Sequence, residues 1–209
     1  MNSKNNAIKD FAESIFSKST QLKYWEHTQR VLKYAIHIAK AERANLDIII
    51  PAVLLHDIGM TVDATFPSHI DKSKLLAQGI LKQLEYSHEE IEQITKVITS
   101  HHPKPGAMLD SIEEQVLFDA DNMEIIGVFG VLRWFGKVPT TLKELDSSID
   151  LFFDIVDKCT KSRGSLFYTE AANKMGSSTL LSTLSYYEKL KEHIKQFEDN
   201  IEFPIPIGF

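Results

Sequence analysis

Apolar side chains recur every three or four positions along most of the chain, a pattern typical of helices that bury one face. Residues 24–44 show it most clearly, because His27, Val31 and Ile38 fall on a single face of a helix. Arg30 is expected to lie away from that face, toward solvent. A histidine among inward apolar positions is unusual, and this one is the first candidate for a functional residue.

Similar patterns predict further helices, and local signals mark several of their ends. Ser87 with Glu90, and Ser111 with Glu114, have the spacing of capping boxes, in which each side chain satisfies a free backbone N–H. Gly59 is expected to end the most apolar helix. The chain is therefore predicted to be all-α and a single domain over residues 1–209, with an irregular tail at 203–209. The other predicted helices cover residues 48–58, 68–86, 89–100, 111–121, 125–135, 142–159 and 168–197.

Composition narrows the class of protein. The chain of 209 residues is 43% apolar and 25% charged, which is typical of a globular protein with a core. A net charge of -6 disfavours binding to a nucleic acid polymer or to an anionic membrane. The single cysteine, Cys159, excludes an internal disulfide and is interpreted as an inert buried thiol. Residues 1–10 lack the apolar run of a signal peptide, so we expect a soluble, cytoplasmic protein.

Three predicted helices each present a metal-binding side chain among apolar neighbours. His56 and Asp57 follow a buried run directly, His27 lies on an apolar face, and Asp121 follows Phe118 in a third helix. Each has an ordinary explanation by itself, either a solvated helix end or a core histidine bonded to a carbonyl. Together they favour a divalent metal ion, which accepts imidazole nitrogen and carboxylate oxygen at once. Asp119 is expected to point elsewhere on its helix.

The local sequence around these residues resembles a known family. Residues 52–59 read AVLLHDIG and residues 118–123 read FDADNM. With His27 upstream they resemble the H…HD…D signature of the HD-domain superfamily, most of whose members are metal-dependent phosphohydrolases. The resemblance covers about residues 20–175, including 98–101, 127–135 and 168–172. It implies a single helical HD-type domain with the metal site between its central helices.

The resemblance also implies roles for individual residues. Asp57 would be both a metal ligand and the residue that orients the attacking water, with His69 and His101 near the metal as further catalytic residues. His69 also has a simpler interpretation as a loop histidine before a helix. His102 is expected to face solvent. The implied metal ligands are His27, His56, Asp57 and Asp121, and the candidate substrate-binding residues are Lys104 and Arg133.

The expected reaction is hydrolysis of a small phosphorylated substrate, a nucleotide, by metal-activated water. Mn²⁺, Fe²⁺, Ni²⁺, Co²⁺, Zn²⁺ and Mg²⁺ all accept this ligand set. Met60 stands where some nucleotidases of the superfamily carry a glutamate, which is a departure from that subgroup. Two alternatives stay open: a diiron oxygenase of a small organic molecule, with His69 and His101 completing a second site, and a non-catalytic regulatory module that holds metal. The sequence leaves a homodimer open.

Overall fold

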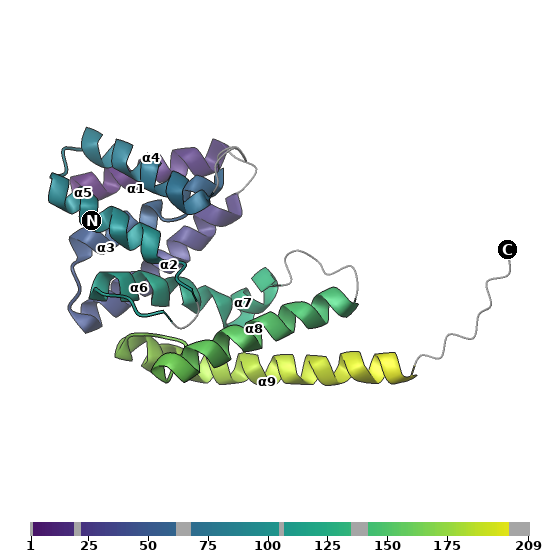
Figure 1. Cartoon of the computed structure of the whole chain (residues 1–209). Coiled ribbons are helices and arrows are strands. Elements are labelled where there is room, and N and C mark those ends of the chain that lie inside the picture. The colour runs from purple at the N-terminus through teal and green to yellow at the C-terminus, as the bar shows by residue number, and fades with distance from the viewer. Residues whose placement is uncertain (1, 19–21, 62–67, 105–106, 135–141, 201–209) are drawn as a thin grey trace, which may run out of the picture.

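The computed structural model describes residues 2–18, 22–61, 68–104, 107–134 and 142–200, and in these ranges every regular element is a helix. The fold class predicted from the sequence is therefore confirmed. Figure 1 shows the arrangement along the chain. The helices are α1 (Ser3–Lys18), α2 (Leu22–Glu42), α3 (Leu46–Leu55), η1 (Ile58–Thr61), α4 (His69–Gln83), α5 (His88–Ser100), α6 (Ile112–Asn122), η2 (Met123–Ile125), α7 (Gly127–Trp134), α8 (Leu142–Arg163) and α9 (Glu170–Asn200).

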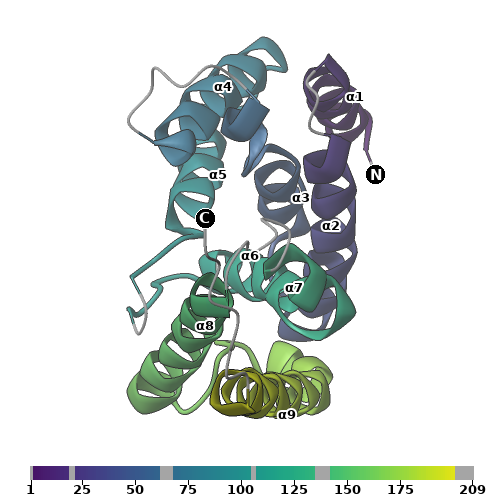
Figure 2. The same ribbon diagram turned by 90° about the vertical axis from the view of Figure 1, so that its right-hand side faces the viewer.

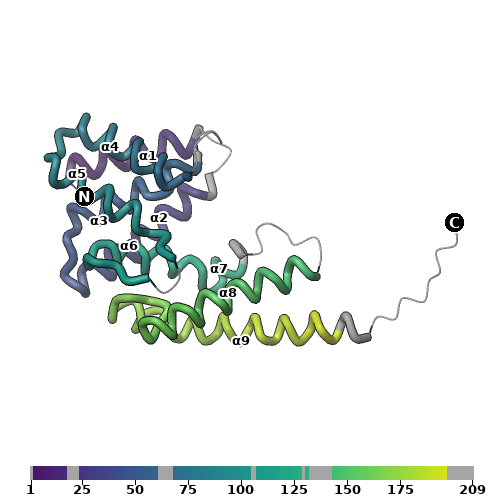
Figure 3. The backbone as a smooth tube through the Cα atoms, viewed as in Figure 1, coloured from purple at the N-terminus to yellow at the C-terminus, as the bar shows by residue number. Residues whose placement is uncertain are grey.

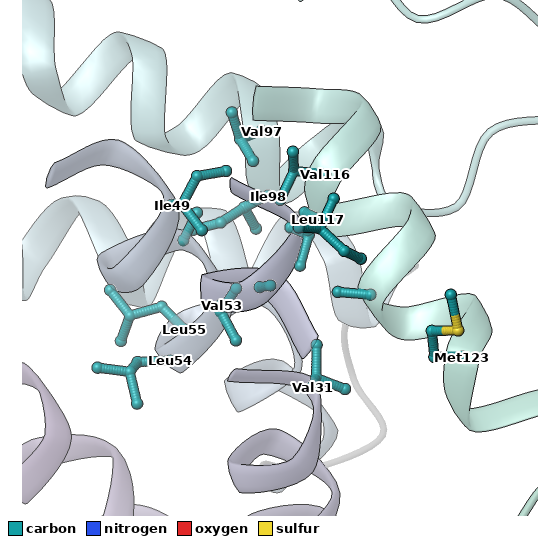
Figure 4. Packing of buried hydrophobic residues seen from close by; sticks show 14 of the residues in the cluster. Val31, Ile49, Val53, Leu54, Leu55, Val97, Ile98, Val116, Leu117 and Met123 are labelled. Carbon is teal, nitrogen blue, oxygen red and sulfur yellow. The ribbon is translucent and has the colours of Figure 1, made fainter. Parts of the chain in front are cut away.

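Helix α3 lies at the centre, packed against α2, α5 and α6 (Figure 2). All of its residues from Ile48 to Leu55 are buried, because it is apolar on every side and can be covered on every side. Figure 4 shows Val53 of α3 among apolar side chains of the surrounding helices, including Val31, Ile98 and Leu117. This packing fixes the C-terminal end of α3, and His56 and Asp57 follow directly after it.

Of the two predicted capping boxes, the one at Ser87 is complete and the one at Ser111 forms only in part, because the Glu114 side chain accepts from the N–H of Asp110 instead. Asn45 caps α3 by accepting a hydrogen bond from the backbone N–H of Asp47. Ser87 and Glu90 form a complete capping box at α5. The Ser111 side chain accepts from the N–H of Glu114 at α6. Each cap satisfies backbone donors that have no partner inside their own helix.

Several helix ends differ from the predicted ranges, and one helix was missed. Helix α3 ends at Leu55, so His56 and Asp57 lie just beyond it, and η1 begins at Ile58. Helix α1 was not predicted, although Ile8, Ala12 and Phe16 are fully buried at a spacing of four residues. That spacing was a readable signal, but the many polar residues between the three obscured it.

The C-terminal helices lie beside this central group. Helix α9, of 31 residues, packs against α8 and also contacts α2 and α7. In Figure 3 the coloured part of α9 continues past the group formed by α1 to α6. None of the described helices combines the length and apolar character needed to span a membrane.

Candidate metal centre

His56 presents a bare ring nitrogen inside the protein. Its Nδ1 lies 2.7 Å from the carbonyl oxygen of Val53, and because a carbonyl can only accept, Nδ1 must carry the proton. Nε2 is then the lone-pair atom, and it is buried with no hydrogen-bond partner among the described residues. Burial lowers the pKa of His56 to about 4, so the ring is neutral near pH 7. A neutral imidazole held in this tautomer is the form that binds a metal ion.

The Asp57 carboxylate lies close to the ring nitrogens of both His27 and His56. Its Oδ2 is 3.6 Å from Nε2 of His56 and 3.8 Å from Nε2 of His27. Burial acts to raise the pKa of this carboxyl, but the charge of His56 and the interaction with His101 hold the pKa well below its ordinary value. Two atoms that bind one ion at about 2.1 Å lie about 3.0–3.4 Å apart. The observed spacings are close to that separation.

Asp121 reaches the same point from the end of α6. Its Oδ1 lies 3.1 Å from Nε2 of His27, which comes from α2. Burial acts to raise the pKa of Asp121, but the hydrogen bond and charge of His27 outweigh it, so the carboxyl stays ionised. The structure thus brings together all four residues proposed as ligands, and three of them form one compact group with nitrogen and oxygen atoms within 4.8 Å of one another: His27, His56 and Asp57.

Behind His27 lies a carboxylate that sequence reasoning missed. Oε2 of Glu124, in η2, is 3.4 Å from Nδ1 of His27 and is held in turn by Arg30 at 2.8 Å. A carboxylate on the far nitrogen of a ligating histidine fixes the ring and leaves Nε2 for the metal. Arg30 was expected to lie away from the inward face. That expectation is wrong, because its guanidinium forms an ion pair with Glu124. The signal available was its position three residues after His27.

A second group of possible ligand atoms shares Asp57. It adds His69, His101 and His102, again with all ligand atoms within 4.8 Å of one another. Oδ1 of Asp57 lies 3.6 Å from Nε2 of His101 and 4.0 Å from Nε2 of His69. Nδ1 of His101 is hydrogen-bonded to the carbonyl oxygen of Ile98. Burial lowers the pKa of His101, but attraction to Asp57 outweighs this and raises the pKa above its ordinary value.

His69 is positioned by a close approach of two backbones. A Cβ on Gly59 would lie 2.1 Å from the carbonyl oxygen of His69 and 2.7 Å from the backbone nitrogen of Ser73. The N–H of Gly59 instead donates to Ser73 Oγ at 2.9 Å. Only glycine permits this contact, which fixes the start of α4 against η1. His69 is therefore placed at the centre, rather than being a loop histidine without a structural role.

His102 is exposed, as expected, yet it is not remote from the centre. Its ring centroid lies 4.2 Å from that of His101 and 5.5 Å from that of His69. His102 could not be assigned to the centre from its position in the sequence, because consecutive residues usually point in different directions. After the end of α5 the chain turns, and both rings can face the same region.

A cavity of about 200 Å³ opens beside these histidines. Lys104, the candidate substrate-binding residue, and Asp121 are among the residues that line it. Arg133 belongs to α7, but its side chain falls outside the described residues. Other residues that line the cavity are Phe118, Ile125, Ile155, Cys159 and Arg163.

Asp119 has a different role from Asp121, as expected from its place on the helix. Its Oδ2 accepts from the N–H and the hydroxyl of Thr169, both at 2.7 Å, and its Oδ1 accepts from the N–H of Tyr168 at 2.8 Å. Burial raises the pKa of Asp119 to about 6, although these bonds oppose the shift. This carboxylate ties the start of α9 to α6 and faces away from the metal ligands.

Comparison with known proteins supports the resemblance to the HD-domain superfamily. The sequence profile of the HD domain matches residues 24–126. The uncharacterized protein YpgQ of Bacillus subtilis is 28% identical over 135 residues, which span 61% of this chain and 63% of YpgQ. The chain thus covers less than two thirds of that relative.

Solved structures share the fold at lower identity. A Lactobacillus plantarum protein superimposes with a TM-score of 0.74 at 20% identity, covering 94% of this chain and 99% of that one. An HD-superfamily hydrolase from Bacillus thuringiensis gives 0.62 at 23%, covering 95% and 98%. YpgQ in complex with ADP gives 0.61 at 23%, covering 96% of both chains.

Proposed function

Because the chain belongs to the HD-domain superfamily, we propose that it is a metal-dependent phosphohydrolase whose substrate is a nucleotide. A solved relative described as an HD-superfamily hydrolase supports hydrolysis as the reaction class. The observation that carries the proposal is the buried histidine and aspartate centre, which borders a cavity lined by Lys104. A metal ion held by this centre and the nearby charge of Lys104 would both attract a phosphate group, so the cavity suits a phosphorylated substrate.

The four residues His27, His56, Asp57 and Asp121 would hold one divalent ion. When bound, such an ion activates water near neutral pH and polarises a phosphoryl oxygen. The bare Nε2 of His56 and the two ionised carboxyls fit this role. The mixture of nitrogen and oxygen donors suits Mn²⁺, Fe²⁺, Ni²⁺, Co²⁺, Zn²⁺ or Mg²⁺.

The remaining residues act on the water and the substrate. Asp57, which faces both ligand groups, orients the attacking water with its second oxygen. His101 and His69 lie on the other side of Asp57, where an imidazolium can bind the phosphate or give a proton to the leaving oxygen. Lys104 and Arg133 neutralise phosphate charge. In this proposal His27, His56, Asp57 and Asp121 bind the ion, and His69, His101, Lys104 and Arg133 contact the substrate.

A nucleotide is the substrate class favoured by the relatives. YpgQ, which shares the fold, was crystallised with ADP, a small phosphorylated ligand. This chain has a net charge of -6, so a polyanionic substrate must be attracted by the local centre rather than by the whole surface. A small nucleotide can meet that condition, because few charges need to be balanced.

The test is metal analysis of the untreated protein, followed by a screen of nucleotides and other phosphorylated metabolites with the identified metal restored. We expect release of phosphate or pyrophosphate from at least one nucleotide. Chelator should remove the activity, and Asp121→Ala should lack it. Bound metal without turnover of any phosphorylated compound would overturn the proposal.

The second ligand group favours one alternative function, oxygenation by a diiron centre. Asp57, His69, His101 and His102 could hold a second ion beside the first. A mixed-valence diiron signal in electron paramagnetic resonance of iron-loaded protein, with consumption of oxygen, would support that alternative. A mononuclear signal with nucleotide hydrolysis would exclude it.

A further inference from the structure

We propose that the cavity beside the metal centre binds the base of the nucleotide and that Arg163 selects a 6-oxopurine, guanine or hypoxanthine, over adenine. The inference rests on the proposed nucleotide hydrolysis. Arg163 lines the same cavity as Asp121 and Lys104, although it comes from the end of α8. No role in the chemistry at the metal has been assigned to it.

Two kinds of side chain line the cavity. His101, His102, Lys104, Asp121 and Asn122 are polar or charged, whereas Phe118, Ile125, Ile155 and Cys159 contribute largely apolar walls. A phosphate chain would be poorly solvated between such walls, while a flat aromatic base would be well packed. The volume of about 200 Å³ is smaller than the about 300–1,000 Å³ of pockets that enclose drug-sized ligands. It therefore suits one part of a nucleotide, with the phosphates outside it at the metal.

The Arg163 guanidinium is held rigidly at the wall of this cavity. Its Cζ lies 3.9 Å from the ring centroid of Tyr168 and 5.1 Å from that of Phe118. One terminal nitrogen donates to the carbonyl oxygen of Leu166 at 2.6 Å. Stacking and this hydrogen bond fix the plane of the group before any ligand arrives. A guanidinium fixed in this way can discriminate between ligands by geometry.

Arg163 also retains a free donor. Its Nε is buried and has no hydrogen-bond partner within the described part of the chain. The adjacent terminal nitrogen carries a second hydrogen besides the one given to Leu166, so the two N–H groups can form a parallel pair. A buried donor without an acceptor is unfavourable, and a ligand that supplies two adjacent acceptors removes the penalty.

A base fits this pair of donors better than a phosphate does. Asp119 already lies near enough for the charge of Arg163 to lower its pKa, which reduces the need for a further anion. Guanine offers two adjacent acceptors, O6 and N7, and arginine pairs with both. Adenine has a donor, N6, in place of O6, and so opposes one of the two N–H groups. The expected preference for guanine over adenine follows from this one difference, an acceptor at O6 in place of a donor at N6.

The test compares guanine with adenine nucleotides of equal phosphate number in the metal-loaded protein. Wild-type protein should favour guanine in kcat/KM by roughly 5- to 150-fold, the range for one paired recognition of a base. Arg163→Gln should remove most of that preference by raising KM for the guanine nucleotide more than for the adenine one. Arg163→Lys keeps the charge but not the parallel donors, and it should also lose the preference.

A matched control is Lys161→Gln, two residues away on α8. Lys161 is exposed and pairs with Asp157, so its loss removes the same charge without touching the cavity. It should keep the wild-type preference. Equal loss of activity toward both nucleotides in Arg163→Gln and Arg163→Lys, with an unchanged ratio, would assign Arg163 a purely structural role and overturn the inference.

Binding of GMP and AMP, measured by calorimetry, separates the two proposals. If the protein turns over nucleotides but binds both bases equally, the selection by Arg163 is wrong and the proposed function stands. If no nucleotide is turned over but GMP binds better than AMP and Arg163→Gln abolishes the difference, the proposed reaction is wrong and the base site stands.

Discussion

Two groups of metal-binding side chains meet at Asp57, and they differ in how they are supported. The group of His27, His56 and Asp57 is buried throughout. The group that adds His69, His101 and His102 is buried at His101, a third exposed at the His69 side chain and exposed at His102. The first group is closed off from solvent, and the second faces the side from which a substrate can arrive.

The two groups also differ in how firmly neighbouring residues hold their histidine rings. His56 is fixed by Val53 and His27 by the Glu124–Arg30 pair, so their ring orientations are set before an ion binds. His69 instead stands at the first position of α4, and its side chain is a third exposed. A preorganised group binds metal more tightly, whereas an accessible group can adapt to substrate. We therefore infer that affinity for the metal resides in the first group and turnover in the second.

The largest effect is expected from Asp57→Ala, which removes the residue common to both groups. Metal binding and activity should both be abolished, because no complete ligand set remains. Stability at saturating metal should also fall, by up to about 2.7 kcal/mol if wild-type protein is held at a metal concentration of 100 Kd. Elemental analysis and thermal unfolding with and without metal measure the two effects.

The exposed carboxylate Asp154 offers a control for that substitution. Asp154→Ala should leave metal content and the metal-dependent rise in Tm unchanged. Stoichiometric metal at unchanged affinity in Asp57→Ala would show that the centre has been misplaced.

His101→Ala should separate the groups. It leaves the first group intact, so at least one ion should stay bound, while turnover should fall by roughly 100-fold or more if the ring acts as acid or phosphate ligand. His102→Ala, on the adjacent exposed ring, should cost clearly less. Kinetics and metal analysis of both variants decide this, and loss of all metal from His101→Ala would instead merge the two groups into one.

Glu124→Gln tests the support behind His27. The amide cannot hold the ring as the carboxylate does, so metal affinity should fall by about 10- to 100-fold while the stoichiometry at saturating metal is kept. Metal titration by calorimetry gives the affinity. Glu26→Gln, an exposed neighbour of His27 in sequence, is the matched control and should behave as wild type. An unchanged affinity in Glu124→Gln would remove Glu124 from the centre.

The smallest effect on the centre is expected from Gly59→Ala. The added methyl group would collide with the start of α4, destabilising the protein by about 1–3 kcal/mol and displacing His69. Turnover should fall while metal affinity of the first group changes little. Gly79→Ala meets no atom within 4 Å and should stabilise the protein by about 0.4–1 kcal/mol. Denaturant unfolding compares the two, and equal stability would refute the close contact at Gly59.

Features decided within a few residues were predictable from the sequence. The caps at Ser87 and Ser111 form because each side chain and its backbone partner are three residues apart. The helical class followed from the spacing of apolar residues, and the resemblance to the HD signature pointed to the four residues that now lie together. In each case the information is local, or repeated along the chain, and does not depend on where distant segments pack.

Only the tertiary structure decided which distant residues meet. Arg30 and Glu124 are 94 residues apart, and nothing in either segment indicates that one would hold the other behind His27. Arg163, at the end of α8, lies over the ring of Phe118 in α6 only because these distant segments pack together. Side-chain type and local spacing specify what a residue is able to bind, but the partner it binds depends on how the helices pack, and packing is a property of the whole chain.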